Sequence, residues 1–382
     1  MKVLLLPGCL SPEYVCRFAR QLSERGHTVI FCAFCDTLTH RTAIESVITH
    51  LPPTVTKRFF PLHPWHFHPR NAIRLLQAIW FILRNRPQII HTQDLDLGSF
   101  VVLLALSCFC PSLPVVATIH DITLHAGSDR HFFYQKAQHY LKARAKRLFI
   151  FEQNAPLPPA MEKWLPKTVF IPLYVDLTAA YEECRDCAIP EEDVILCFGW
   201  ISVYKGIEYL IDAVQQNTVR FPTIKLIIAG RTGTTSEDRT YSRHLHARAK
   251  NTPWCEIKSR YHTHEETAKL FKRAKIVVLP YKEASQSGIV SLACYFKKPV
   301  IATTVGNLPR QVINDRSGIL VPPCDSAALA AAVGTLLSDE EKRKRMGAQG
   351  HHDFIHDASE KQTLNIITAT YHQVVSNENT AP

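Results

Sequence analysis

Residues Leu279 to Leu320 read LPYKEASQSGIVSLACYFKKPVIATTVGNLPRQVINDRSGIL. This stretch combines a strand end, a polar loop, a helix opening and a second strand. Ile276 to Leu279 is β-branched and apolar like a buried strand, and Ile289 to Phe296 has the length of a helix. Gly288 lies between them and lets a backbone approach a ligand closely. The free N–H groups and the macrodipole of a helix's first turn favour a phosphate, so this layout predicts an anion site.

Four other pieces of the chain carry comparable patterns. Ile195 to Ala213 reads ILCFGWISVYKGIEYLIDA, which predicts a strand, a turn through Gly199 and an amphipathic helix after the pair Lys205–Gly206. The others are PQIIHTQD at 87–94, VVATIHD at 115–121 and IPLYVD at 171–176. The helix at 289–296 is preceded by an E-A-x-Q-S-G loop and followed by P-V-I-A-T-x-V-G-x-L-P. With these motifs and the four other pieces, the chain resembles the family 4 retaining glycosyltransferases of the GT-B fold. The pieces stand in the family's order and span nearly the whole chain.

The resemblance implies an α/β fold of two doubly wound Rossmann-like domains that face each other across a cleft. We expect residues 1–174 to form the acceptor-side domain and residues 175–355 the nucleotide-sugar donor domain. Residues 356–382 would be a helix that crosses back to the first domain, followed by a tail. The length agrees, because 382 residues exceed the size at which one hydrophobic core stops growing.

The resemblance also implies site residues. Breaking a sugar–diphosphate bond requires stabilisation of the leaving group by fixed cations and backbone donors. Glu283 is the nearest candidate for the family's sugar-binding acid, His120 matches a histidine near the anomeric centre, and Asp121 would orient that ring or meet the acceptor. The expected catalytic residues are therefore His120, Glu283 and Lys205, and the expected donor-binding residues are Gly199, Lys205, Arg231, Glu283, Gln286, Ser287, Gly288 and Ile289.

Two departures from the family pattern motivate an alternative. Trp200 stands where the family usually has an arginine, although Arg231 is a candidate substitute. Ser291 stands eight residues after Glu283, where the E-x7-E pattern requires the second acid. The preferred hypothesis is a retaining transferase that uses a UDP- or GDP-activated sugar and a saccharide or lipid-linked acceptor, as in polysaccharide biosynthesis. The alternative is an inactive GT-B subunit that activates a partner transferase, and a nucleotide-sugar epimerase is the weakest option.

Composition restricts partners and cofactors. The net charge of +10 implies attraction to something acidic, such as a nucleotide sugar or an anionic lipid. No RNA-binding signature with interleaved aromatic residues appears, so we expect no nucleic acid partner. Two C-x-x-C pairs, at 32–35 and 184–187, are too far apart for a known zinc pattern. We expect no metal, no cofactor and reduced thiols in a cytoplasmic protein.

Two apolar segments raise the question of a membrane. Ser99 to Ile119 is long enough to span one, but Pro111 and Pro114 interrupt it, so we expect a helix at 97–109 and a buried strand at 115–119. Pro69 to Arg86 mixes four arginines with many apolar residues and could lie on an anionic membrane surface. A domain helix with solvated arginines is the other interpretation. The arginines concerned are Arg70, Arg74, Arg84 and Arg86.

Overall fold

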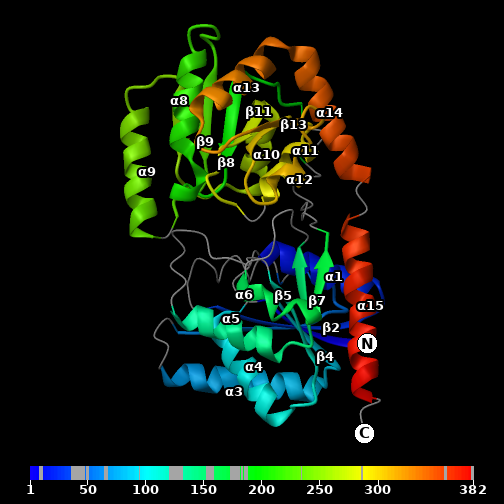
Figure 1. Ribbon diagram of the computed structural model, residues 1–382. Helices are drawn as coiled ribbons and strands as arrows, with labels where there is room; N and C mark the ends of the chain where they lie inside the picture. Colours follow the sequence, from blue (N-terminus) through cyan, green and yellow to red (C-terminus); the bar gives the residue numbers. More distant parts are fainter. Residues whose placement is uncertain are drawn as a thin grey trace.

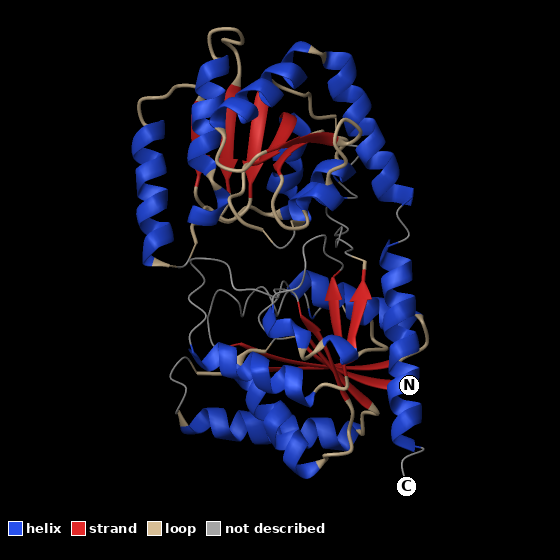
Figure 2. Ribbon diagram, in the orientation of Figure 1, coloured by secondary structure: helices blue, strands red, loops and turns tan. Residues whose placement is uncertain are grey.

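The computed structural model describes residues 1–7, 12–35, 48, 51–63, 68–93, 95–119, 132–151, 159–172, 181, 184, 188–233, 235–284, 287–356 and 359–379. These residues form two parallel β-sheets, each with helices on both faces (Figures 1 and 2). The predicted fold of two Rossmann-like domains is confirmed.

The first sheet has seven strands in the order β3-β2-β1-β4-β5-β6-β7. Its central strands are buried on both faces, which is why they read as continuous apolar runs such as Val3–Leu6. Separate hydrophobic clusters cover the two faces. The strands are β1 (Lys2–Leu6), β2 (Thr28–Cys35), β3 (Thr56–Pro61), β4 (Ile89–Gln93), β5 (Val115–Ile119), β6 (Arg147–Phe151) and β7 (Thr168–Ile171).

Helices surround this sheet. α3 and α4 lie side by side on one face, at the end of the molecule farthest from the second sheet (Figure 1). The helices of this part are α1 (Pro12–Glu24), α3 (Pro69–Asn85), α4 (Leu97–Phe109), α5 (Phe132–Arg144), α6 (Pro159–Glu162) and the 3₁₀ turn η1 (Leu165–Lys167).

The second sheet has six strands in the order β10-β9-β8-β11-β12-β13. The strands are β8 (Val194–Phe198), β9 (Lys225–Ala229), β10 (Cys255–Lys258), β11 (Ala274–Leu279), β12 (Val300–Thr303) and β13 (Gly318–Val321). The helices are η2 (Val203–Lys205), α8 (Ile207–Asn217), α9 (Ser236–Ala249), α10 (His264–Arg273), α11 (Gly288–Tyr295), α12 (Leu308–Gln311), α13 (Ser326–Ser338) and α14 (Glu340–His356).

The last helix, α15 (Ser359–Asn379), returns to the first sheet and packs near β6 and β7 (Figure 1). Tyr371 is fully buried there, and its hydroxyl is hydrogen-bonded to Nδ1 of His91 on β4. The other ring nitrogen of His91, Nε2, lies 2.8 Å from Oγ1 of Thr118. A buried polar network therefore ties the end of the chain to the centre of the first sheet.

The predicted helix at 97–109 and strand at 115–119 are confirmed as α4 and β5. Two edge strands were not anticipated. β3 carries Lys57, Arg58 and Pro61, and only one of its residues is buried, so its sequence lacks a strand signal. The other is β7, which is only four residues long and has one buried residue, Ile171. Among the described residues, no helix is long and apolar enough to cross a membrane.

Candidate functional site

The second sheet has its topological switch point between β8 and β11. The chain proceeds from β8 outward to β9 and β10, then crosses to β11 on the opposite side of β8. In open parallel sheets, ligands bind outside the carboxyl ends of the strands at such a point. Two loops meet there: residues 199–206 follow β8, and residues 280–284 follow β11. The predicted donor loops are therefore neighbours in space.

Two glycines allow the backbones of this region to approach closely. A Cβ added at Gly230 would lie 1.8 Å from the carbonyl oxygen of Gly199, and one added at Gly206 would lie 2.3 Å from that of Pro280. Gly206 also has a left-handed φ of 59°. The backbone N–H of Lys282 donates to the carbonyl of Tyr204 over 2.8 Å, which joins the two loops.

Lys205 ends η2 and is buried. Its Nζ lies 3.5 Å from the ring centroid of Tyr281 and 4.9 Å from that of Tyr204, so the ammonium sits against two aromatic faces. Burial lowers the pKa of Lys205 to about 7, and the nearby thiol of Cys197 opposes this shift only in part. Within the described residues, no carboxylate forms an ion pair with Lys205. The site therefore holds a buried lysine that has no carboxylate partner in the described part of the chain.

The N-terminus of α11 opens next to this lysine's loop. Ser287 caps the helix, because its hydroxyl accepts a hydrogen bond from the N–H of Ile289 over 3.4 Å. Gly288 is exposed, and a Cβ placed there would meet no atom of the described residues within 4 Å, its chain neighbours aside. The Cβ position of Gly199 lies 3.9 Å from the side chain of Ile289, so the loop after β8 faces the first turn of α11. An anion in this open space would meet backbone donors of the helix.

Gln311 of α12 holds the loop at the start of α11. Its Oε1 accepts from the N–H of Ser287 over 2.9 Å, and its Nε2 donates to the carbonyl of Ser287 over 3.0 Å. The hydroxyls of Ser287 and Tyr281 lie 3.2 Å apart, and Thr303 donates to the carbonyl of Tyr281. These contacts connect the cap of α11 to the ring on which Lys205 packs.

A second network supports the loop after β8. Tyr241 on α9 donates to Glu208 and accepts from the N–H of Ile207, while Lys282 forms an ion pair with Glu208 over 3.1 Å. Burial, followed by the bond to Glu208, raises the pKa of Tyr241. Asp238 accepts from the hydroxyl of Ser202 over 2.6 Å. Lys282 is thus already paired with a carboxylate, whereas Lys205 has no such partner among the residues that the structure describes.

The remaining predicted residues lie in different surroundings. Glu283 is exposed in the loop after β11. The guanidinium of Arg231 packs over the ring of Tyr261 at 4.8 Å, and Trp200 is 47% exposed. His120, Asp121 and Gln286 lie outside the described residues.

Sequence reasoning did not identify Tyr281 or Gln311. Tyr281 lies two residues after the end of the buried strand β11, and an aromatic residue just after such a strand, close to a predicted anion site, is a usable signal. Gln311 gave no signal, since its role depends on a contact with a residue 24 positions away.

Each half of the chain matches a known protein family. Residues 185–353 match the family described as Glycosyl transferases group 1, and residues 12–155 match Glycosyltransferase Family 4.

Similar proteins include an alpha-D-kanosaminyltransferase of Streptomyces kanamyceticus, 30% identical over 45% of this chain and 43% of that protein. A D-inositol 3-phosphate glycosyltransferase of Corynebacterium glutamicum is 30% identical over 51% of this chain and 47% of its own length. A GDP-mannose:glycolipid 4-beta-D-mannosyltransferase of Xanthomonas campestris is 25% identical over 66% of each. The chain thus matches less than half of the length of the first two of these relatives.

Solved structures share the fold. Sucrose-phosphate synthase from Thermosynechococcus elongatus superposes with a TM-score of 0.71 at 19% identity, covering 99% of this chain and 100% of that one. Anabaena Alr3699/HepE, in complex with UDP and glucose, gives 0.68 at 18% identity and covers 98% and 100%. At these identities the likeness concerns the fold alone.

Proposed function

We propose that this chain, which carries the family 4 and group 1 domains of the GT-B glycosyltransferases, transfers a glycosyl group from a nucleotide-activated sugar with retention of configuration. The donor would be UDP- or GDP-linked. The acceptor would be a saccharide or a lipid-linked saccharide, met on the cytoplasmic side of a membrane.

The observation that carries the proposal is the pairing of a buried cation with an open helix N-terminus. Lys205 has no carboxylate partner among the described residues, and the first turn of α11 faces the loop that carries it. A diphosphate supplies the negative charge that both features lack.

Transfer breaks the bond between the anomeric carbon and the diphosphate oxygen, and the electron pair stays on the diphosphate. The acceptor's hydroxyl oxygen forms the new bond to the anomeric carbon, and its proton passes to the leaving diphosphate. We propose that Lys205, the N–H of Gly288 and the positive end of α11 at Ile289 stabilise this developing charge. Ser287, Gln286, Gly199 and Arg231 would complete the donor site. No metal is needed in this scheme, because fixed protein charges and dipoles meet the diphosphate.

Three residues would act nearer the sugar. Glu283 would bind sugar hydroxyls, His120 would contact the sugar close to the anomeric carbon, and Asp121 would face the acceptor. These roles rest on the resemblance of the surrounding motifs.

The similar proteins support the substrate classes. One of them is named a GDP-mannose:glycolipid mannosyltransferase. That name contains a GDP-linked donor and a lipid-linked acceptor, which are among the classes that we propose here.

A thermal-shift panel of UDP, GDP, ADP and their sugars tests the proposal. A ligand at about 100 times its dissociation constant adds roughly 2.7 kcal/mol, which raises the melting temperature by several degrees. We expect one nucleotide diphosphate to stabilise the wild type and His120→Ala equally, while His120→Ala loses transfer to a matched acceptor. Stabilisation without transfer or donor hydrolysis by the wild type would indicate an inactive subunit, and no shift with any nucleotide would reject the donor site.

A further inference from the structure

We propose that the outer face of α3 and α4 is an insertion surface for an anionic lipid bilayer. This face is a ridge of exposed apolar side chains with arginines beside it. It consists of Ile73, Leu76, Trp80 and Leu83 of α3, Leu104 and Phe109 of α4, and the arginines Arg70, Arg74, Arg84 and Arg86.

The apolar residues of α3 form one stripe. Ile73, Leu76, Trp80 and Leu83 are spaced by three or four residues, so they share one side of the helix. The opposite side, with Ala78 and Ile82, is buried against the first sheet. A surface helix normally exposes polar residues on that outer side. Here Leu76 is 66% exposed and Trp80 is 59% exposed, so the core does not account for them.

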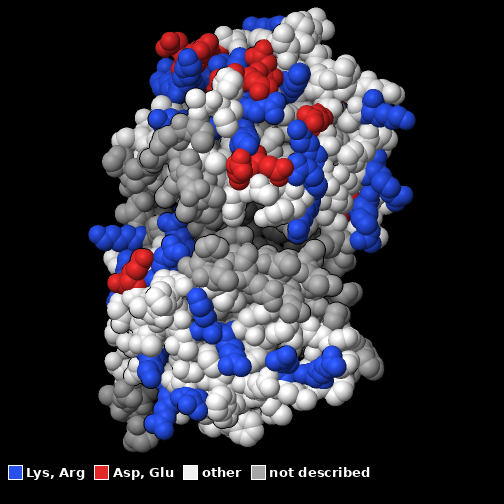
Figure 3. Space-filling model, turned by 180° about the vertical axis from the view of Figure 1, so that it is seen from behind, with Lys and Arg blue, Asp and Glu red and all other residues white. Residues whose placement is uncertain are grey.

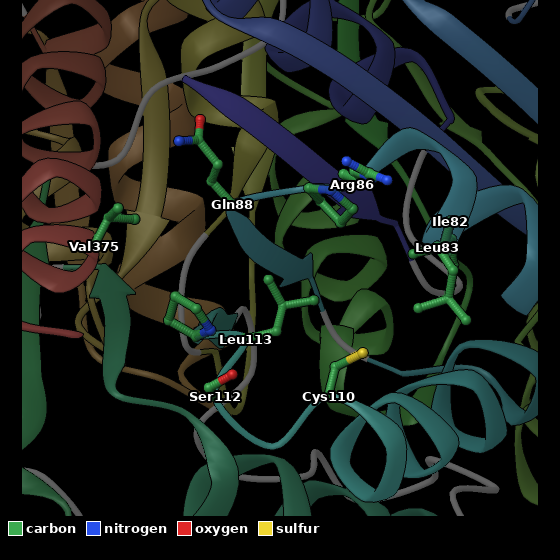
Figure 4. Close-up of a pocket in the computed structure, with 10 residues that line it drawn as sticks. Ile82, Leu83, Arg86, Gln88, Cys110, Ser112, Leu113 and Val375 are labelled. Carbon is green, nitrogen blue, oxygen red and sulfur yellow. The ribbon is translucent and has the colours of Figure 1, made fainter. Parts of the chain in front are cut away.

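α4 extends the apolar surface. It contains no charged residue, and Phe109 at its last position is 73% exposed. The ends of α3 and α4 lie together, because Leu83, Arg86 and Cys110 line one pocket of ≈ 560 Å³ (Figure 4). The ends of the two helices therefore lie near each other, and each carries an exposed apolar side chain, Leu83 on α3 and Phe109 on α4.

The charge on this face has one sign. The sequence contains no Asp or Glu between Glu45 and Asp94, nor between Asp96 and Asp121, so neither helix carries an acid. The charged side chains in view on the lower half of the molecule in Figure 3 are almost all Lys and Arg. A protein partner with an acidic surface would satisfy the arginines but leave the apolar ridge in water, whereas an anionic bilayer satisfies both.

The arrangement of Trp80 and Arg84 also suits a bilayer interface. The guanidinium of Arg84 lies 5.2 Å from the ring of Trp80. Tryptophan favours the headgroup region, and an arginine can keep its charge among the phosphates while its stem covers apolar surface. By helical spacing, Arg70, Arg74 and Arg84 lie along one side of the stripe, so headgroup contacts need not compete with insertion.

Flotation with vesicles of phosphatidylcholine, with and without phosphatidylglycerol, tests the proposal on the full chain. We expect binding to the anionic vesicles only, falling as salt rises from about 0.1 M to about 1 M and the Debye length shrinks from ~10 Å to ~3 Å. Each of Arg70→Gln and Arg74→Gln should weaken partitioning about fivefold. Leu76→Ser and Trp80→Ser should each weaken it about tenfold.

Matched controls lie on the second domain. Val219→Ser replaces an isolated exposed apolar residue there, and Arg243→Gln replaces an exposed arginine of α9; both should bind vesicles like the wild type. All variants should keep the same melting temperature and the same nucleotide shift, which separates this surface from the donor site. Equal binding to both vesicle types, or none, would overturn the proposal. So would a wild-type dimer, measured by light scattering, that Leu76→Ser and Trp80→Ser convert to a monomer.

Discussion

Nζ of Lys205 lies 3.5 Å from the ring centroid of Tyr281, and both side chains are buried at the carboxyl ends of β8 and β11. The ring provides the cation with a face of negative potential but no full counter-charge. This arrangement destabilises the empty protein and favours an anionic ligand. Two of the predictions below follow from it.

Lys205→Met should stabilise the protein and strongly reduce its turnover. Because burial lowers the pKa of Lys205 from 10.5 to about 7, the unfolded chain binds a proton between these values that the folded chain does not hold. The free energy of unfolding of the wild type should therefore increase as the pH rises from about 7 towards 10.5. Methionine removes the free-energy cost of burying a protonated lysine, so the variant should have a higher melting temperature than the wild type at pH 6 to 7. This difference in melting temperature should shrink at higher pH.

The same variant should lower turnover by roughly two to three orders of magnitude, as expected for a missing donor to a developing charge. Lys225→Met, at the exposed start of β9, is the matched control and should leave both properties unchanged. A Lys205→Met protein with wild-type turnover would exclude this lysine from the donor site.

Donor binding should be coupled to proton uptake. Near a diphosphate the pKa of Lys205 should rise, so at pH 8, where most free protein has a neutral lysine, binding takes up close to one proton. The affinity for the nucleotide should fall by up to about tenfold per pH unit above about pH 7. Calorimetry at pH 8 in buffers of different ionisation enthalpy measures the uptake. Loss of the buffer dependence in Lys205→Met would assign it to this residue, while its persistence would assign it elsewhere.

The parts of the fold that sequence predicted best are those buried on both faces. β5 and β11 read as apolar runs because helices cover both sides of the sheets, and α4 reads as a helix because Pro111 ends the pattern. The edge strand β3 escaped detection, since an edge needs fewer apolar residues and carries Lys57 and Arg58 instead.

The candidate site was also predictable only where the sequence signal was local. The anion-binding helix start was predictable from Gly288 and its flanking strand and helix, because the signal is local. The burial of Lys205 was not, since it depends on Tyr281, which lies 76 positions away but on the neighbouring strand end. The clamp by Gln311 depends on α12 packing beside the loop, which no local pattern encodes.

Glu283→Ala should weaken binding of a full nucleotide sugar more than binding of the bare nucleotide. Glu283 is an exposed carboxylate in the loop between β11 and α11, so its removal should leave the fold intact. If Glu283 binds sugar hydroxyls, the variant should lose binding free energy only for the nucleotide sugar. The expected loss is about 1.5–3 kcal/mol, as for hydrogen bonds to a charged group. Titration with UDP and UDP-sugar, or the GDP pair, measures the difference. Glu237→Ala in the first turn of α9 is the control, and equal losses for nucleotide and nucleotide sugar would place Glu283 outside the sugar site.

Gln311→Glu should impair donor binding, because Gln311 positions Ser287 of the proposed donor site. The amide bonds both the N–H and the carbonyl of Ser287, and a carboxylate can keep only the first of these contacts. Its second oxygen would face the Ser287 carbonyl, and its charge would offset the positive end of α11 that is to hold the diphosphate. We expect a loss of about 1–3 kcal/mol in stability and about tenfold or more in nucleotide affinity.

Gln311→Met removes the clamp without adding charge, so it should show the stability loss with a smaller loss of affinity. Gln216→Glu, on the exposed side of α8, adds the same charge away from the loop and should change neither. Nucleotide affinities of Gln311→Glu and Gln311→Met that both equal the wild type would show that the clamp does not position α11 for its ligand.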